Sequence, residues 1–142
     1  MEKILIIGQA PPMQTQTVPY DTTLLYEMLG WVGISKEDAQ NLFDFEAVSN
    51  EFPGLNKNGG HKPPSLRSMY EHWDKTLYAK WAKSNRIIIL GEVARNFIFK
   101  FGKPLTRLDQ NVVCLIHPSK RNYSKIMSSK ESIKKSLEQI LK

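Results

Sequence analysis

The chain has 142 residues, of which 41% are hydrophobic and 24% are charged, and this composition is typical of one soluble globular domain, residues 1–142. It contains neither the run of about 18 or more apolar residues that crosses a membrane nor a secretory signal peptide, so we expect a cytoplasmic monomer without membrane contact. The net charge of +6 favours a polyanionic partner, because lysine and arginine side chains neutralise phosphates.

The first predicted element is a buried strand from Ile4 to Ile7 that ends at Gly8. A short run of β-branched apolar residues is typical of the centre of a parallel sheet. The prolines that follow, Pro11 and Pro12, prevent the chain from continuing as a helix. We therefore expect Gln9 just beyond the carboxyl end of a central strand, where open α/β sheets bind ligands, although the segment also fits a simple tight exit from a strand.

Helices and strands then alternate along the chain. Helical spacing and capping residues predict helices over 24–29, 35–42, 65–83 and 92–101, and a C-terminal helix that begins with a capping box of Ser128 and Glu131. Apolar or alternating patterns predict further strands over 43–49, 86–90 and 112–116, the last with Cys114 buried inside it. Strands that alternate with helices in this way predict a single doubly wound α/β domain with a four-stranded parallel sheet flanked by helices.

Two features limit the kinds of site that the chain can hold. Cys114 is the only cysteine, which excludes an internal disulfide, a cysteine-ligated iron–sulfur cluster and a multi-cysteine zinc site, and we expect neither a metal nor another cofactor. The tryptophans of the 65–83 helix stand at the spacing of a buried face, so they are expected in the core rather than against a ligand.

Four residues follow the carboxyl ends of the predicted strands: Gln9, Asn50, Gly91 and His117. Because the carboxyl ends of parallel strands meet at one edge of a sheet, these residues are expected to lie together. Asn50 alone would fit a turn residue, and His117 alone would fit the end of a strand before a proline. As a group they predict a polar pocket that grips a small planar ligand.

The segment after His117 is basic. Its charged residues are Lys120, Arg121, Lys125, Lys130, Lys134, Lys135 and Lys142, against Glu131 and Glu138. One interpretation is the solvated face of a C-terminal helix. The other is an anion contact, because Lys120 and Arg121 come directly after His-Pro-Ser.

Five short motifs occur in order over nearly the whole chain. They are Gly8-Gln9-Ala10-Pro11-Pro12, Pro19-Tyr20, Asn50 with Pro53-Gly54, Leu90-Gly91 with Ala94, and His117-Pro118-Ser119. In these motifs and their order the chain resembles the uracil-DNA glycosylase superfamily. The family's first motif is Gly-Glu-Ala-Pro-Gly or Gly-Gln-Asp-Pro-Tyr, and its later landmarks are Pro-Phe, an asparagine before a Pro-Gly loop, Leu-Gly before a helix with alanine, and His-Pro-Ser. The pattern is most similar to that of the short bacterial and archaeal families.

The resemblance implies a DNA glycosylase of base excision repair, which flips uracil or another deaminated or mismatched base out of DNA and hydrolyses its N-glycosidic bond. It implies that Gln9 positions water and that His117 stabilises the departing base. The implied base pocket has Tyr20 stacked on the base and Asn50 at its Watson–Crick edge, together with Gly8, Ala10 and Pro11. The implied contacts to DNA come from Ser119, Lys120, Arg121 and Tyr123.

The chain departs from the family pattern at the acid that activates water. Gln9 and Ala10 stand where other families carry Asp or Glu, and glutamine cannot accept a proton from water. Asp21 is the nearest candidate carboxylate, unless it only caps the following helix. Two alternatives therefore stay open: a weakly active or inactive member that binds nucleic acid or nucleotides, and a different nucleotide-handling α/β enzyme that shares only the sheet.

Overall fold

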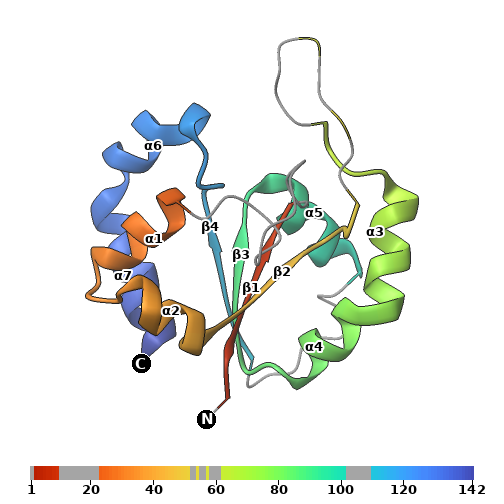
Figure 1. Cartoon of the computed structure of the whole chain (residues 1–142), viewed down its shortest axis with the longest axis horizontal. Coiled ribbons are helices and arrows are strands. Elements are labelled where there is room, and N and C mark those ends of the chain that lie inside the picture. Colours follow the sequence, from red (N-terminus) through yellow and green to blue (C-terminus); the bar gives the residue numbers. More distant parts are fainter. Residues whose placement is uncertain (1, 10–22, 52–53, 55–56, 58–61, 102–109) are drawn as a thin grey trace.

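The computed structural model describes residues 2–9, 23–51, 54, 57, 62–101 and 110–142. A four-stranded sheet lies between two layers of helices, as Figure 1 shows. This arrangement confirms the predicted doubly wound α/β architecture. Within the described ranges, no helix is long and apolar enough to cross a membrane.

All strand pairs of the sheet are parallel, and the order across it is β2-β1-β3-β4. The strands are β1 (Ile4–Gly8), β2 (Phe43–Ala47), β3 (Arg86–Leu90) and β4 (Asn111–Leu115). The chain runs from β1 outwards to β2 and then returns to β3 and β4 on the other side of β1. Because this direction reverses between β1 and β3, the carboxyl ends of these two strands form the switch point at which such sheets bind ligands.

One layer of helices covers the face of the sheet that carries Ile4, Ile6 and Ile88. It consists of α1 (Thr23–Gly30), α2 (Lys36–Leu42), α6 (Tyr123–Ser128) and α7 (Lys130–Leu141), on the left in Figure 1. The predicted start of α2 is confirmed, because the Ser35 side chain accepts a hydrogen bond from the Asp38 N–H at 3.1 Å.

The second layer covers the face with Leu5, Ile7 and Ile89. It consists of α3 (Leu66–His72), α4 (Tyr78–Lys83) and α5 (Glu92–Phe101). α3 and α4 together form the helix predicted over 65–83, but a π-helical turn, η1 (Trp73–Leu77), joins them. The apolar stripe expected on this helix is confirmed as core, since its buried members are Met69, Trp73, Leu77 and Trp81.

The two outer strands correct the sequence-based boundaries. β4 covers Asn111–Leu115 rather than 112–116, and Cys114 within it is exposed rather than buried. An apolar strand sequence does not distinguish a central strand from an outer one, because the helices that cover the sheet decide burial. β2 ends at Ala47 rather than at residue 49, although the Val48 N–H still donates to the Gly8 carbonyl at 3.0 Å.

The capping box predicted for the last helix is wrong. Ser128 ends α6, a helix that the sequence did not predict, and its hydroxyl donates to the Lys125 carbonyl at 3.0 Å. α7 begins after Ser129, whose side chain makes no capping hydrogen bond. The Lys125 carbonyl also accepts the Ser129 N–H at 3.1 Å, so Ser128 and Ser129 both bind backward to the last turn of α6 instead of forward to α7.

Candidate functional site

The carboxyl ends of the four parallel strands form one rim of the sheet. Gln9, Gly91 and Asn50 follow β1, β3 and β2, and His117 stands two residues beyond β4. The prediction that these residues share one edge is therefore confirmed. Across the rim they follow the order of the strands, so Asn50 and His117 lie at its two ends and Gln9 and Gly91 lie at the switch point between them.

His117 packs directly against Gly91. A Cβ added to Gly91 would lie 2.9 Å from the Cβ of His117 and 3.4 Å from its Cγ, so only glycine leaves room for this side chain. Gly91 has a φ of +87°, a conformation that favours glycine, and its N–H donates to the Leu115 carbonyl at 2.9 Å. This contact places the side chain of His117, which follows the outer strand β4, at the switch point beside the end of β3.

The end of β1 is fixed to the end of β2. Gly8 is buried, and its carbonyl accepts the hydrogen bond from Val48, which places half-buried Gln9 at the rim. Four other residues predicted for this part of the site lie outside the described residues: Ala10, Pro11, Tyr20 and Asp21. Their roles stay predictions.

Asn50 is exposed, and it lies between Glu51 and the buried Ser49, which are hydrogen-bonded to each other. The Ser49 hydroxyl accepts a hydrogen bond from the Glu51 N–H at 3.2 Å and lies 3.5 Å from the Glu51 carbonyl. It also bonds to the hydroxyl of Ser68 in α3, and both serines are less than 8% exposed. The sequence reasoning missed this pair, because nothing in a local pattern indicates that two serines 19 positions apart meet in the core.

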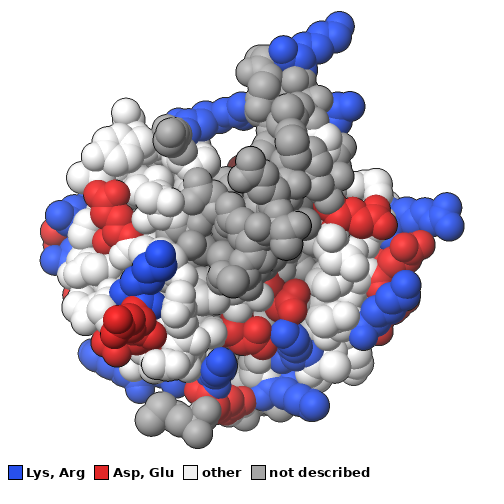
Figure 2. Space-filling model, in the orientation of Figure 1, with Lys and Arg blue, Asp and Glu red and all other residues white. Residues whose placement is uncertain are grey.

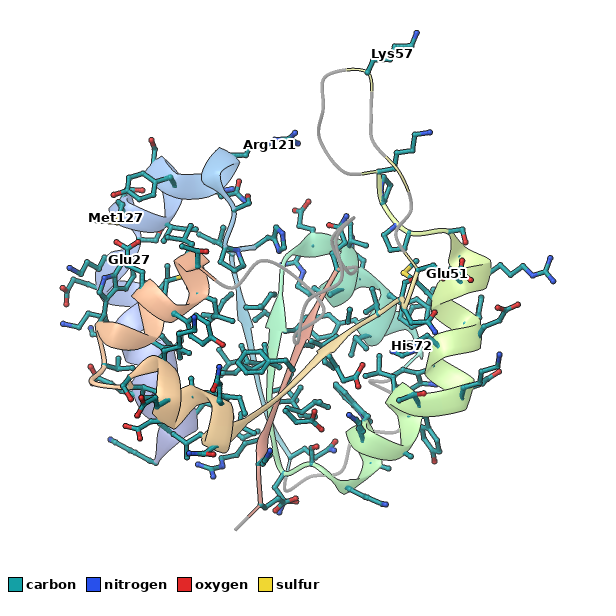
Figure 3. All side chains as sticks on the ribbon, in the orientation of Figure 1. Glu27, Glu51, Lys57, His72, Arg121 and Met127 are labelled. Atoms are coloured by element: carbon teal, nitrogen blue, oxygen red, sulfur yellow. The ribbon has the colours of Figure 1, made fainter. Side chains whose placement is uncertain are left out.

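Three of the four residues predicted to hold DNA lie together after His117. Ser119 is half-buried, Arg121 and Tyr123 are exposed, and the backbone of Lys120 begins the short 3-10 turn η3 (Lys120–Asn122) between them. Figure 3 shows that Arg121 projects beyond the rim on the side of α6, whereas Lys57 projects beyond it on the side of α3. Figure 2 shows lysine or arginine side chains at that end of the molecule.

A charged network that the sequence reasoning missed lies between β2 and α3–α4. Glu46 accepts hydrogen bonds from His72 at 3.1 Å and from Lys80 at 2.7 Å, and Lys80 also bonds to Asp44 at 3.2 Å. Burial alone would raise the pKa of Glu46, but these hydrogen bonds and the charge of Lys80 hold it below its ordinary value. Burial by itself would lower the pKa of Lys80, but the hydrogen bonds and charges of Glu46 and Asp44 have the larger effect and raise this pKa above its ordinary value.

This network stabilises the layer that carries α3 and is not part of the rim. Glu46 and Asp44 belong to the strand itself and point to the face covered by α3–α4, as do their register partners Ile7 and Leu5. In the part of the chain that the structure describes, no three His, Cys, Asp or Glu residues are grouped closely enough to hold a metal ion.

The fold and the rim agree with a comparison of the sequence with protein families. The model of the family described as "Uracil DNA glycosylase superfamily" matches residues 1–141. A search of curated proteins found no match. The family match covers every strand and every residue of the rim, and the chain therefore belongs to the uracil-DNA glycosylase superfamily.

Proposed function

We propose that the chain is a DNA glycosylase that removes uracil or another deaminated or mismatched base from DNA. The observation that supports this proposal is the position of His117 in a member of this superfamily. Its side chain lies at the switch point, next to Gly91, because glycine at this positive φ leaves room for it. A histidine ring held there can donate a hydrogen bond to a base carbonyl. Such a fixed donor stabilises charge that develops during the reaction.

The reaction breaks the bond between C1′ of deoxyribose and the base nitrogen. The bonding electrons leave with the base, and His117 and Asn50 stabilise the negative charge that the base acquires. Water adds to C1′ and gives up one proton, the departed base anion takes up one proton, and the products are the neutral free base and an abasic site. The target must first be flipped out of the stack, because its glycosidic bond is inaccessible in the duplex. Tyr20 stacks on the flipped base in this proposal.

Gln9 orients the attacking water, and Asp21 is proposed to accept its proton, because glutamine cannot do so. The described rim offers a second carboxylate for comparison. Glu92 follows Gly91 directly, and its side chain is 85% exposed. Asp21→Asn and Glu92→Gln therefore distinguish the two: the variant that loses turnover while it still binds DNA identifies the base.

DNA contacts on one side of the rim come from Ser119, Lys120, Arg121 and Tyr123. On the other side of the rim, Lys57 and Lys62 are both exposed, and Figure 3 shows Lys57 beyond the rim on the side of α3. The Lys62 N–H donates to the Gly54 carbonyl at 3.0 Å, which holds Lys62 next to Gly54. Positive charge on both sides of the rim suits a duplex that carries phosphates on two strands.

The test is a glycosylase assay on oligonucleotides that contain one uracil, hypoxanthine or xanthine, single-stranded and opposite each normal base, followed by alkaline cleavage of abasic sites. We expect cleavage of at least one substrate, with a loss of 100-fold or more in His117→Ala and Asn50→Ala, since removing one such donor typically costs about 10²–10³ in rate. Cleavage by His117→Ala and Asn50→Ala at the wild-type rate would refute the roles assigned to these two residues.

The second candidate is a binding protein of the same fold. Gln9 favours it, because the first motif supplies no group that can take a proton from water. This candidate predicts that no substrate is cleaved, while binding to a damaged base still depends on Asn50 and Tyr20. Preference for free nucleotides over DNA would instead indicate a different nucleotide-handling enzyme.

A further inference from the structure

Asn122 occupies the N-cap position of α6, yet its side chain makes no capping hydrogen bond. Asparagine at this position usually accepts a hydrogen bond from a backbone N–H in the first turn of the helix. The Asn122 side chain instead turns backward, and its Nδ2 donates to the His117 carbonyl at 3.0 Å. Asn122 is also the last residue of η3, from which α6 continues directly, so its side chain is available to bind the residue that precedes the turn.

Three hydrogen bonds close the chain from His117 to Asn122 into a fixed turn. The Ser119 N–H donates to the His117 carbonyl at 2.9 Å, and the Asn122 N–H donates to the Ser119 carbonyl at 3.0 Å. The side-chain bond from Asn122 is the third. The His117 carbonyl therefore accepts two hydrogen bonds, which is the capacity of a carbonyl oxygen. Pro118, which links His117 to Ser119, is buried.

The two sides of His117 are thus restrained by different residues. Gly91 packs against its Cβ and ring, and Asn122 holds its carbonyl. Because Cβ and the carbonyl carbon share the same Cα, fixing both determines the direction in which the ring leaves the backbone. Loss of the Asn122 bond would remove the restraint on the carbonyl side that comes from a side chain.

We propose that Asn122 is a positioning residue for His117, and this inference rests on the proposed role of His117 in stabilising the departing base. A displacement of about 1 Å in a reacting group can lower a rate by about 10²-fold. Without Asn122 the ring therefore samples orientations in which it does not reach the base carbonyl. DNA binding through the neighbouring basic residues does not need this orientation.

Two variants separate the hydrogen bond from the size of the side chain. Asn122→Ala removes the donor. Asn122→Asp preserves the shape and remains a good helix N-cap, but an ionised carboxylate only accepts hydrogen bonds and cannot bind the His117 carbonyl. The matched control is Ser128→Ala, because Ser128 also donates from its side chain to a backbone carbonyl, at the other end of α6.

The measurements are the single-turnover cleavage rate at saturating protein, the affinity for DNA, the unfolding midpoint and the ¹H–¹³C NMR signals of the histidine rings. The chain has only three histidines, so the signal of His117 can be assigned by its loss in His117→Ala. We expect both Asn122 variants to cleave at least tenfold more slowly and to shift the His117 signal. Ser128→Ala should change neither, and Asn122→Ala should bind DNA within about twofold of the wild type.

An unchanged His117 signal in both variants would overturn the proposal, whatever happens to the rate. A shifted signal with a wild-type rate would also overturn it, because the ring position would then not matter for the reaction. If the wild-type protein cleaves no substrate, the proposed function fails, and the NMR signals still decide whether Asn122 sets the position of His117.

Discussion

A Cβ on Gly91 would lie 2.9 Å from the Cβ of His117, so His117 can occupy its place only because residue 91 is glycine. Gly91 ends a central strand, β3, and His117 follows an outer strand, β4. Their contact therefore determines how closely the histidine approaches the switch point. This steric relationship has direct consequences for activity.

We expect Gly91→Ala to reduce cleavage at least tenfold, because the new methyl group displaces His117. Stability should fall by about 1–3 kcal/mol, since alanine is strained at positive φ. Gly33→Ala is the matched control: Gly33 has a φ of +82° and no atom within 4 Å of the position of an added Cβ. It should lose similar stability but retain full activity. Equal activity of the two variants would show that the Gly91 contact does not position His117.

The Ser49–Ser68 pair is expected to support both stability and base selection. Ser68→Ala leaves the buried Ser49 hydroxyl without this partner, which should cost about 1–3 kcal/mol in the free energy of unfolding. Ser49 binds the Glu51 N–H and so holds the backbone on both sides of Asn50. The ratio of cleavage rates between the preferred base and the next best base should therefore also fall in Ser68→Ala. Ser35→Ala removes the cap of α2 and should cost about 1 kcal/mol without changing this ratio. Chemical denaturation and the substrate panel measure both quantities.

The Glu46–Lys80 pair should stabilise the fold over a defined pH range. The pKa of Glu46 is lowered, so its contribution is present above its ordinary value of 4.5 and is lost as the pH falls through the lowered pKa. The pKa of Lys80 is raised, so its contribution is present below its ordinary value of 10.5 and is lost as the pH rises through the raised pKa. The stability difference between wild type and Lys80→Met should be greatest between these limits.

A control for this pH experiment is Arg67→Met. Arg67 and Glu71 form an ion pair one helical turn apart, with side chains 90% and 50% exposed, and such pairs contribute about 0.3–0.5 kcal/mol. Denaturant midpoints measured across the pH range should show a smaller effect for Arg67→Met than for Lys80→Met. A pH-independent difference for Lys80→Met would contradict the assignment.

The exposed lysines Lys57 and Lys62 should contribute to DNA affinity through contacts with phosphates. Replacing Lys57 and Lys62 by alanine should make the slope of log K against log salt concentration shallower by about 1.8, which corresponds to two lost phosphate contacts on duplex DNA. Lys75 and Lys83 provide a matched pair of exposed lysines on the η1–α4 segment. Their double alanine variant should leave the slope unchanged, and an equal effect of both pairs would indicate a general charge effect.

Much of the fold could be predicted because its signals are local. The apolar run at β1, the serine caps of α2 and α3 and the apolar stripe from Met69 to Trp81 each depend on residues a few positions apart. The arrangement of the rim could also be predicted, since parallel strands place their carboxyl ends on one edge. The ends of β2 and β4 were predicted one or two residues too late, because an apolar pattern does not show where the hydrogen bonds between strands stop. Ser128 was wrongly predicted to cap the last helix, because its hydroxyl binds the Lys125 carbonyl instead.

The sequence by itself determined the family, the alternation of strands and helices, and the residues that follow the carboxyl ends of the strands, because these depend on short motifs and on the periodicity of apolar side chains. Only the tertiary structure decided that Gly91 makes room for His117, that Asn122 binds the carbonyl of that histidine rather than capping α6, and that Ser49 meets Ser68. Each of these contacts depends on backbone torsions and on distances between separate elements, and a linear pattern contains neither.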